Sequence, residues 1–300
     1  MKVLIAGASG FLGQALAKEL IAHRHLVHTL VRRAPAASTE IEWHPERGEL
    51  DPELLAGYGA VIGLSGAGIS DKRWTAAYKR ELLDSRLGPT GTLATALAAL
   101  PADRRPATFI SASAIGYYGE RGDQPLPESA AAGTGFLAGL VIQWEAATQP
   151  AVDAGVRVLT LRTGLVLSAG GGLMKRLVPL YKLGLGGKLG SGQQYQSWIT
   201  LADEVGAIRH LLETDGVDGP VNLAGPAPVR NDEFSSVLGS VLHRPSIFPT
   251  PAFGIRLVLG EFADEGALAS QRVIPEKLAA SGYQFQHADI RTALEWAVKN

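Results

Sequence analysis

The sequence predicts an α/β protein with a doubly wound parallel sheet, followed by a small, mostly helical C-terminal portion. Short apolar runs alternate with helical patterns through most of the first 225 residues. A glycine-rich turn joins the first of these runs to the first helical pattern. Strands that alternate with helices in this way form parallel sheets, because each crossover helix returns the chain to the same edge.

The chain opens with a strand, a turn, a helix and a second strand. Residues 3–6 are a short apolar run ended by a glycine, which is typical of a buried parallel strand. Apolar side chains recur at helical spacing over residues 11–22, and a second strand-like run follows at 27–31. Further strands are expected at residues 60–64, 108–111, 156–161 and 221–223, and helices at 86–100, 136–148 and 201–213.

The alternation breaks twice. Residues 168–197 are rich in glycine and predict long loops around one short helix, on the substrate side of the sheet. After Pro226 the pattern becomes helical, with Asn231 as the expected N-cap of the first helix. These helices are expected at 232–243, 274–281 and 289–299. The predicted organisation is a sheet domain over residues 1–225 and a small helical domain over 226–300.

The composition excludes several classes of protein. The chain has 300 residues, 46% of them hydrophobic, and is long enough to bury a full core. Its 28 Lys+Arg and 29 Asp+Glu residues give a net charge of −1, which offers no overall basic field to nucleic acid or to an anionic membrane. The absence of cysteine excludes disulfides, iron–sulfur clusters, thiolate zinc sites and cysteine nucleophiles. With no membrane span, signal peptide or histidine metal pattern in the sequence, we expect a cytoplasmic protein without a metal site.

The turn after the first strand has the features of a phosphate-binding loop. Gly7, Gly10 and Gly13 follow the spacing G-x-x-G-x-x-G. The first permits a tight turn, the second lets a pyrophosphate approach the backbone, and the third lets the helix pack closely on the strand. The helix N-terminus supplies free N–H groups and a positive dipole end. We expect a dinucleotide to contact Gly7, Ser9, Gly10, Phe11, Leu12 and Gly13; an ordinary turn in a glycine-rich chain is the alternative.

The end of the second strand discriminates between the two nicotinamide dinucleotides. An acidic residue there holds the ribose 2′-hydroxyl, whereas an arginine accommodates a 2′-phosphate. Arg32 and Arg33 stand at this end, and no acidic residue follows until Glu40. Because a guanidinium forms paired hydrogen bonds with phosphate, we expect NADP(H), with Arg32 carrying the discrimination and Arg33 assisting. A solvated arginine pair is the alternative, and it fits Arg33 better.

Further segments share their residues with one family. They read LSGAGI at 64–69, RW at 73–74, SR at 85–86, SASAIGYYG at 111–119, WE at 144–145, LRTGLVL at 161–167, SWI at 197–199 and NL at 222–223. Together with the glycine turn they resemble the extended, sugar-nucleotide-epimerase-like form of the short-chain dehydrogenase/reductase superfamily, in its branch of "epimerase family proteins". The tail over 260–283 resembles that branch's C-terminal domain of unknown function. The resemblance implies an NAD(P)-binding Rossmann fold.

The resemblance also implies further cofactor contacts. It places Leu64, Ser65 and Gly66 along the adenosine side of the cofactor, in the loop after the strand at 60–64. Leu165 follows the strand whose end meets the nicotinamide amide. Glu81 and Arg86 lie in a segment that resembles the branch's cofactor-facing helix, and a surface salt bridge is the alternative for Arg86.

The catalytic pair of the superfamily is missing. Its reductases use a serine with a Tyr-x-x-x-Lys pair, because an ammonium must stabilise the phenolate of a tyrosine whose free pKa is about 10. Extended members commonly have a glutamate four residues after the lysine, and Glu145 fits that position. This alignment puts Val141 at the lysine position and Leu137 at the tyrosine position. Neither side chain transfers protons, so the standard catalysis is not available.

Ser113 matches the serine position of the superfamily, and Tyr117 and Tyr118 follow it on the exit from the same strand. We expect Ser113 to bind a substrate oxygen and either tyrosine to act as a substitute proton donor; packing of both rings against the pocket wall is the alternative. Glu145 is a further candidate acid or base, since burial raises a carboxyl pKa, or it has a structural role.

Three functions are compatible with these residues. The first is an NADP(H)-dependent oxidoreductase or epimerase-like enzyme that acts on an unknown small molecule. The second is a non-catalytic NADP(H)-binding sensor or scaffold, which the missing Tyr/Lys pair favours. The third is a sugar-nucleotide epimerase proper, which the missing pair argues against. Nucleic acid and membrane are not among the expected partners.

Overall fold

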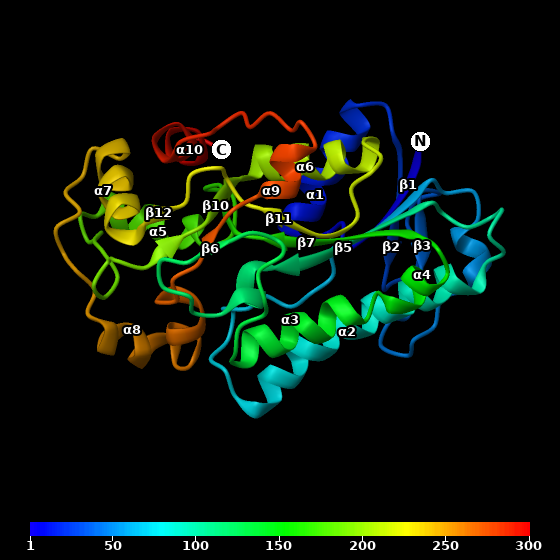
Figure 1. Ribbon diagram of the computed structural model, residues 1–300, viewed down its shortest axis with the longest axis horizontal. Helices are drawn as coiled ribbons and strands as arrows, with labels where there is room; N and C mark the ends of the chain where they lie inside the picture. Colours follow the sequence, from blue (N-terminus) through cyan, green and yellow to red (C-terminus); the bar gives the residue numbers. More distant parts are fainter.

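The computed structural model describes residues 1–300 and has one central parallel sheet of seven strands, in the order β11-β7-β5-β4-β1-β2-β3 (Figure 1). The strands are β1 (Lys2–Ala6), β2 (Leu26–Val31), β3 (Glu40–Glu42), β4 (Ala60–Gly63), β5 (Thr108–Ala114), β7 (Arg157–Thr163) and β11 (Gly219–Leu223). The chain runs outward from β1 to β3 and then returns to β4 on the other side of β1. In such a sheet this reversal creates the ligand crevice, at the carboxyl ends of β1 and β4.

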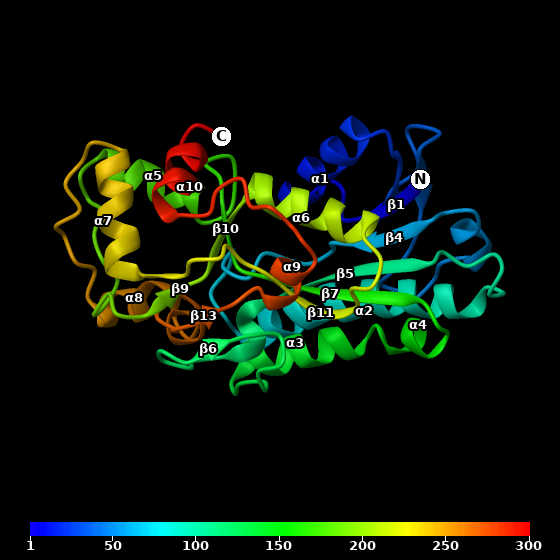
Figure 2. The ribbon, with the colours of Figure 1, turned by 45° about the horizontal axis from the view of Figure 1, so that its top comes forward.

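Helices cover both faces of the sheet. One face carries α1 (Phe11–Ala22) and α6 (Leu201–Glu213), and the other carries α2 (Ala76–Ala99), α3 (Phe136–Ala146) and α4 (Gln149–Asp153) (Figures 1 and 2). Val3 and Ile5 belong to the core beneath α1 and α6. Leu4 and Ala6 belong to the core beneath α2 and α4. Because successive side chains of a strand point to opposite faces, β1 must be apolar throughout. The predicted doubly wound α/β fold is confirmed.

The helix predicted at 86–100 is wrong at its start, because α2 begins at Ala76. Thr75 caps this helix, and its side-chain oxygen accepts a hydrogen bond from the N–H of Tyr78 at 3.1 Å. Pro89 lies inside the helix. Because a proline within a helix is usually found in the first turn, it makes a start just before residue 89 look favourable in the sequence. By contrast, α1 and α6 have the predicted bounds, and all the predicted strands are present.

Asn231 is not an N-cap. It is the first residue of α7 (Asn231–Val241), and its side-chain oxygen accepts a hydrogen bond from the backbone N–H of Leu189 at 2.7 Å. The Asn231 side chain therefore bonds the glycine-rich loop and does not cap the N-terminus of α7. Only the structure reveals this, because Leu189 is far from Asn231 in the sequence.

The C-terminal portion is mostly helical, as predicted, and it shares a core with an earlier part of the chain. Its helices are α7, α8 (Ala252–Leu259), α9 (Glu276–Ala280) and α10 (Ile290–Ala297). α7 and α10 bury side chains together with α5 (Met174–Lys182), β8 (Leu165–Leu167) and β10 (Trp198–Thr200). The short helix predicted within 168–197 is α5, and the division of the chain at residue 225 stays a prediction.

Short strands tie these parts together. β8 pairs with β10, β9 (Tyr195–Gln196) with β12 (Val229–Arg230), and β6 (Pro125–Leu126) with β13 (Arg272–Val273). The pairing of β6 with β13 brings the C-terminal portion against the loop that leaves β5. No helix combines the length and the apolar character that a membrane crossing requires.

Truncation of Phe234 is expected to destabilise the protein. Phe234 on α7 is 2% exposed and packs in the cluster that α7 shares with α5, α10 and β10. A Phe→Ala change in such a core costs about 3–5 kcal/mol, since a cavity adds to the lost burial. Denaturant unfolding of Phe234→Ala should show this loss. The control Phe253→Ala, whose side chain is 74% exposed, should stay within about 0.5 kcal/mol of the unchanged protein. Equal midpoints for both variants would contradict the shared core.

Candidate functional site

The glycine turn brings β1, α1 and the end of β4 into contact. Gly7 has a positive φ of 83°, and a Cβ at this residue would lie 2.7 Å from the carbonyl carbon of Leu64. A Cβ at Gly13 would lie 2.3 Å from the carbonyl oxygen of Gly7. Only glycine fits these two positions, the first because of the turn and the second because α1 packs so closely on β1. This is the geometry that a phosphate loop requires of its first and third glycines.

The first turn of α1 is open to an anion. Gly10 is the N-cap and has no side chain to bond the free N–H groups, and no acidic residue lies in the first turn. The backbone oxygen of Ser9 accepts a hydrogen bond from the Gln14 side chain at 2.8 Å, which fixes the turn. A helix start with unsatisfied N–H groups and no carboxylate nearby suits a phosphate.

The glycine-rich segment after β8 closes one side of this turn. Phe11 at the start of α1 is 36% exposed, and a Cβ at Gly171 would lie 2.4 Å from its ring. The neighbouring Leu12 is half-buried and packs on the core beneath α1 and α6. Residues from two distant segments therefore form the walls around the helix start.

The arginines at the end of β2 have different surroundings. Arg33 donates to both oxygens of Glu40, at 2.8 and 2.6 Å, and to the backbone oxygen of Ala34. The neighbouring Arg32 is exposed and forms no ion pair. Arg32 therefore has a free guanidinium beyond the carboxyl end of β2, whereas Glu40 already occupies that of Arg33. This difference agrees with the stronger role that the sequence assigned to Arg32.

A buried arginine of α2, without a carboxylate partner, lies against the loop after β4. Leu64 and Ser65 are half-buried and Gly66 is exposed, at the end of β4 beside the glycine turn. Arg86 on α2 donates to the backbone oxygens of Ala67 at 2.9 Å and Leu82 at 3.1 Å. Its guanidinium also lies over the ring of Trp144. Burial lowers the pKa of Arg86 to about 10, since only backbone oxygens, a hydroxyl and a ring face the charge.

Glu81 and Leu165 have local partners. Glu81 forms an exposed ion pair with Lys72 at 2.9 Å. Leu165 is half-buried at the start of β8, and its N–H donates to the backbone oxygen of Ser197 at 2.8 Å. The structure thus places Leu165 just beyond the carboxyl end of β7 and Glu81 on the outer surface of α2, and cofactor contact by either stays a prediction.

A row of polar side chains crosses three strands near the expected nicotinamide end. Ser113 on β5 is in register with Arg162 on β7, and Arg162 is in register with Asn222 on β11. Glu145 on α3 lies over the row. It accepts one hydrogen bond from Ser113 Oγ at 2.6 Å and two from Arg162, both at 2.8 Å. Burial alone lowers the pKa of Arg162, but Glu145 outweighs this and the pKa is raised above its ordinary value.

The two candidate tyrosines differ in accessibility. Tyr118 is fully buried, and its hydroxyl donates to Asn222 at 2.7 Å and accepts from Arg162 at 3.1 Å. Burial raises the pKa of Tyr118. Tyr117 is half-buried, its hydroxyl has no hydrogen-bond partner, and the Arg162 guanidinium lies 3.4 Å from its ring centre. Of the two, only Tyr117 has a hydroxyl free to reach a ligand.

The positions of the missing pair are apolar in the structure as well. A Cβ at Gly116, in the 3₁₀ turn Ile115–Tyr118, would lie 3.3 Å from the Cβ of Leu137 and 3.9 Å from Val141. Leu137 and Val141 therefore pack against the exit from β5, where the superfamily has its tyrosine and lysine. Arg162 and Asn222 were not singled out from the sequence. The signal for both was a polar residue inside an otherwise apolar strand, at Leu161-Arg162 and Val221-Asn222.

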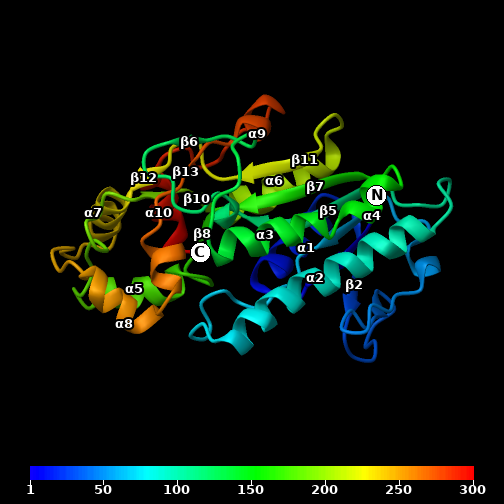
Figure 3. The same ribbon diagram turned by 60° about the horizontal axis from the view of Figure 1, so that its bottom comes forward.

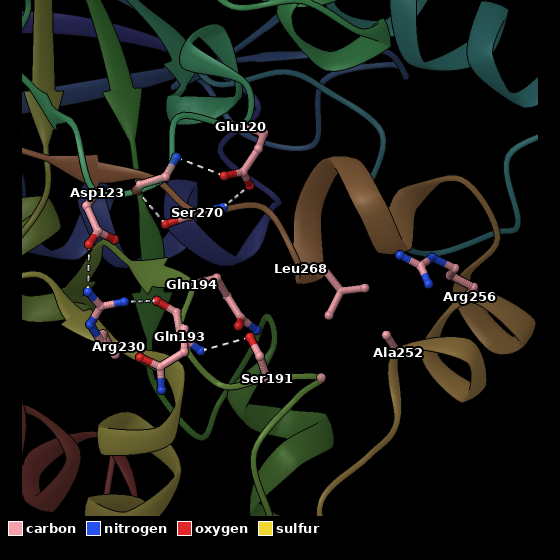
Figure 4. A pocket seen from close by; sticks show the side chains of 12 residues that line it. Glu120, Asp123, Ser191, Gln193, Gln194, Arg230, Ala252, Arg256, Leu268 and Ser270 are labelled. Carbon is pink, nitrogen blue, oxygen red and sulfur yellow. Dashed lines mark hydrogen bonds and ion pairs between the residues drawn. The ribbon is translucent and has the colours of Figure 1, made fainter.

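A polar cavity of about 510 Å³ lies where the C-terminal portion meets the loop after β5 (Figure 4). Asp123, Gln193 and Arg230 gather on one wall, and Arg230 donates to Asp123 at 2.8 Å. Ala252 and Leu268 are its hydrophobic lining residues. Nearby, the Gln271 side chain donates to the backbone oxygens of Ile115 and Gly119, which ties the C-terminal portion to the turn that holds Tyr117.

Glu204 on α6 has a fully buried carboxyl, which lies against Thr163 at the end of β7. One of its oxygens accepts a hydrogen bond from Thr163 Oγ1 at 2.8 Å, and the other has no partner. Burial raises the pKa of Glu204 to about 8, and the hydrogen bond from Thr163 offsets only part of this. The side chain is therefore neutral at neutral pH.

The pKa of Glu204 predicts a loss of stability as pH rises. In the unfolded chain this carboxyl releases its proton near pH 4.5, whereas in the folded protein it keeps the proton up to about pH 8. The free energy of unfolding should therefore fall between these values, because the unfolded state binds fewer protons. Urea unfolding of the unchanged protein and of Glu204→Gln at pH 5 and pH 8 measures this. The free energy of unfolding of the variant should rise relative to that of the unchanged protein between pH 5 and pH 8. If both proteins lose the same amount of stability over this range, the prediction is contradicted.

Two family models match the chain. Residues 3–224 match the model described as NAD dependent epimerase/dehydratase family, and residues 250–297 match a domain of unknown function, DUF1731. Among curated proteins, an epimerase family protein of Mycobacterium bovis is 49% identical, with 98% of this chain and 97% of the relative covered. The human epimerase family protein SDR39U1 is 34% identical, with 98% and 99% covered.

Solved structures agree with this likeness. The crystal structure of human SDR39U1 with NADPH has a TM-score of 0.91 and 32% identity, and each chain is covered completely at 100%. A nucleoside-diphosphate sugar epimerase of Corynebacterium glutamicum has a TM-score of 0.81 and 33% identity, with 99% of this chain and 58% of that chain covered. The NADPH of the first structure is bound to human SDR39U1.

Proposed function

Because the chain belongs to the NAD dependent epimerase/dehydratase family, we propose that it is an NADP(H)-dependent oxidoreductase that acts on a small molecule. The observation that carries the cofactor assignment is the open helix start at Gly10 together with the unpaired Arg32 beyond β2. The NADPH found with the human relative supports the same choice.

The residues around the crevice fit the parts of this cofactor. The N–H groups of α1 suit the pyrophosphate, and Arg32 suits the 2′-phosphate of the adenosine ribose. Leu64, Ser65 and Gly66 would line the adenosine side. Arg86, whose charge no carboxylate balances, would favour the anionic cofactor from beneath the same loop. When bound, NADP(H) supplies or accepts a hydride at C4 of its nicotinamide ring.

The polarity of the hydrogen bonds assigns different roles to Ser113 and Tyr117. The single proton of the Ser113 hydroxyl is donated to Glu145, so the serine presents lone pairs to a ligand. The Tyr117 hydroxyl has no partner and would donate its proton to a substrate oxygen. The Arg162 guanidinium over the tyrosine ring would stabilise the negative charge left on it, which is the task of the missing lysine.

The polar cavity extends the proposal to the substrate. Asp123, Gln193 and Arg230 offer both donors and acceptors, but the Arg230 charge is already paired with Asp123. A hydroxylated small molecule would fit such a wall better than an unpaired anion would. The cavity would hold the part of the substrate that does not react.

A non-catalytic NADP(H)-binding sensor is the second candidate function. Leu137 and Val141 favour it, because they place apolar side chains where the superfamily transfers protons. The two functions share the cofactor and differ in turnover. A sugar-nucleotide epimerase proper is the weakest candidate for the same reason.

Replacement of Arg32 should change the choice of cofactor. Arg32→Asp removes a charge-assisted hydrogen bond to phosphate and adds repulsion, so NADPH affinity should fall about 10- to 100-fold while NADH affinity is kept or rises. Calorimetry with both dinucleotides measures this. Arg33→Ala is the matched control, since Glu40 already pairs with that side chain, and it should change the ratio of affinities little. An unchanged ratio in Arg32→Asp would overturn the assignment.

Turnover separates the enzyme from the sensor. NADPH oxidation should be followed against a library of carbonyl compounds, with the unchanged protein, Ser113→Ala and Tyr117→Phe. The proposal expects oxidation by some members of the library, a loss of at least about 100-fold in kcat in Tyr117→Phe and a smaller loss in Ser113→Ala, with NADPH affinity unchanged in both. Tight NADPH binding without oxidation of any compound would favour the sensor.

A further inference from the structure

One end of the molecule exposes a group of large apolar side chains. They come from α5 with the loop after it, from residues 247–248 and from α8, which lie together at the same end of the ribbon (Figure 3). The most exposed are Leu183, Leu185, Ile247, Phe253, Leu257 and Val258, with exposed fractions from 59% to 74%. We call this group the α5–α8 patch. Large apolar patches of this kind mark contact surfaces on soluble proteins.

Hydrogen bonds join the segments of the α5–α8 patch. The N–H of Phe248 donates to the oxygen of Gly186 at 3.3 Å, and the N–H of Thr250 donates to the oxygen of Lys188 at 2.9 Å. The Arg244 side chain donates to the oxygen of Lys182 at 3.0 Å. The loop after α5 is thus held beside the segment that leads into α8, and the exposed apolar side chains come from these joined segments.

The segments that form the α5–α8 patch carry charges of one sign. No Asp or Glu occurs in residues 154–202 or 234–260, which include every segment of the patch, although the whole chain carries a net charge of −1. Lys175, Lys182 and Arg244 are exposed and form no ion pair with a carboxylate. Arg256 and Arg176 do pair with acidic residues outside these segments. The patch is therefore apolar with an unbalanced basic border.

We propose that the α5–α8 patch docks the protein on an anionic lipid surface. Apolar side chains flanked by lysine and arginine are the pattern of interfacial membrane association, which requires no spanning helix. A second copy of the chain is the poorer occupant, because a two-fold contact would bring the same cations together. The net charge of the whole chain argues against membrane binding. It does not reveal that the charged residues of the patch segments are all basic.

Vesicle flotation tests the proposal. The protein should float with vesicles of phosphatidylcholine and phosphatidylglycerol at low salt. It should not float with vesicles of phosphatidylcholine alone. It should also not float with the mixed vesicles at about 0.5 M salt, because salt then screens the attraction between charges within a few ångströms. Lys175→Glu/Lys182→Glu should lower binding at least about tenfold. Lys18→Glu/Arg47→Glu makes the same change of charge at exposed residues outside the patch and should bind normally.

A second pair of variants tests the apolar side chains. Phe253→Glu/Leu257→Glu should abolish flotation, whereas Ile142→Glu/Val152→Glu, at residues each 44% exposed outside the patch, should not. NADPH affinity, measured in parallel, reports whether each variant is folded. Absence of flotation with anionic vesicles at low salt, or equal losses in the patch and control variants, would overturn the proposal. A dimer in solution that only Phe253→Glu/Leu257→Glu disrupts would also overturn it and assign the patch to a second copy.

Discussion

The buried ion pair between Arg162 and Glu145 fixes the arrangement of the catalytic candidates. Burying two charges costs more than their attraction returns unless hydrogen bonds satisfy both groups. Here two N–H groups of Arg162 bond Glu145, and a third bonds Tyr118 and the backbone oxygen of Glu128. Since Ser113 donates to the same carboxylate, the pair fixes the positions of β5, β7 and α3 relative to one another. The positions of Ser113 and Tyr117 follow from it.

Two other arginines near the crevice, Arg32 and Arg86, contrast with Arg162. Arg162 has its charge balanced inside the protein, and so has Arg33 at the surface. Arg32 and Arg86 have no carboxylate partner, although one is exposed and the other is buried. A protein keeps an unbalanced buried cation at a cost, and a polyanionic ligand offsets that cost when it binds. The two unbalanced arginines lie beside the loops that follow β2 and β4, where the crevice of a doubly wound sheet binds its ligand.

The features predicted from the sequence were those set by neighbouring residues. The glycine turn, the bounds of α1 and the fold class depend on local spacing, and the structure has them. The start of α2 was missed because proline is favoured in the first turn of a helix, which places the expected start just before Pro89, whereas packing on the sheet retains Pro89 inside the helix. The row of Ser113, Arg162 and Asn222 was missed because it depends on the register of three strands far apart in the sequence. No local pattern encodes that register.

The row also explains why an arginine fits where a lysine is absent. A lysine on α3 would present a single ammonium to a tyrosine hydroxyl one turn away. The planar guanidinium of Arg162 bonds both oxygens of Glu145 along one edge and still stacks its face on the Tyr117 ring. It reaches the face of the tyrosine ring from β7, so α3 needs no polar residue at that point. Leu137 and Val141 can then pack against the exit of β5. The apolar side chains at the positions of the Tyr-x-x-x-Lys pair and the polar row on the sheet are therefore compatible within one packing arrangement.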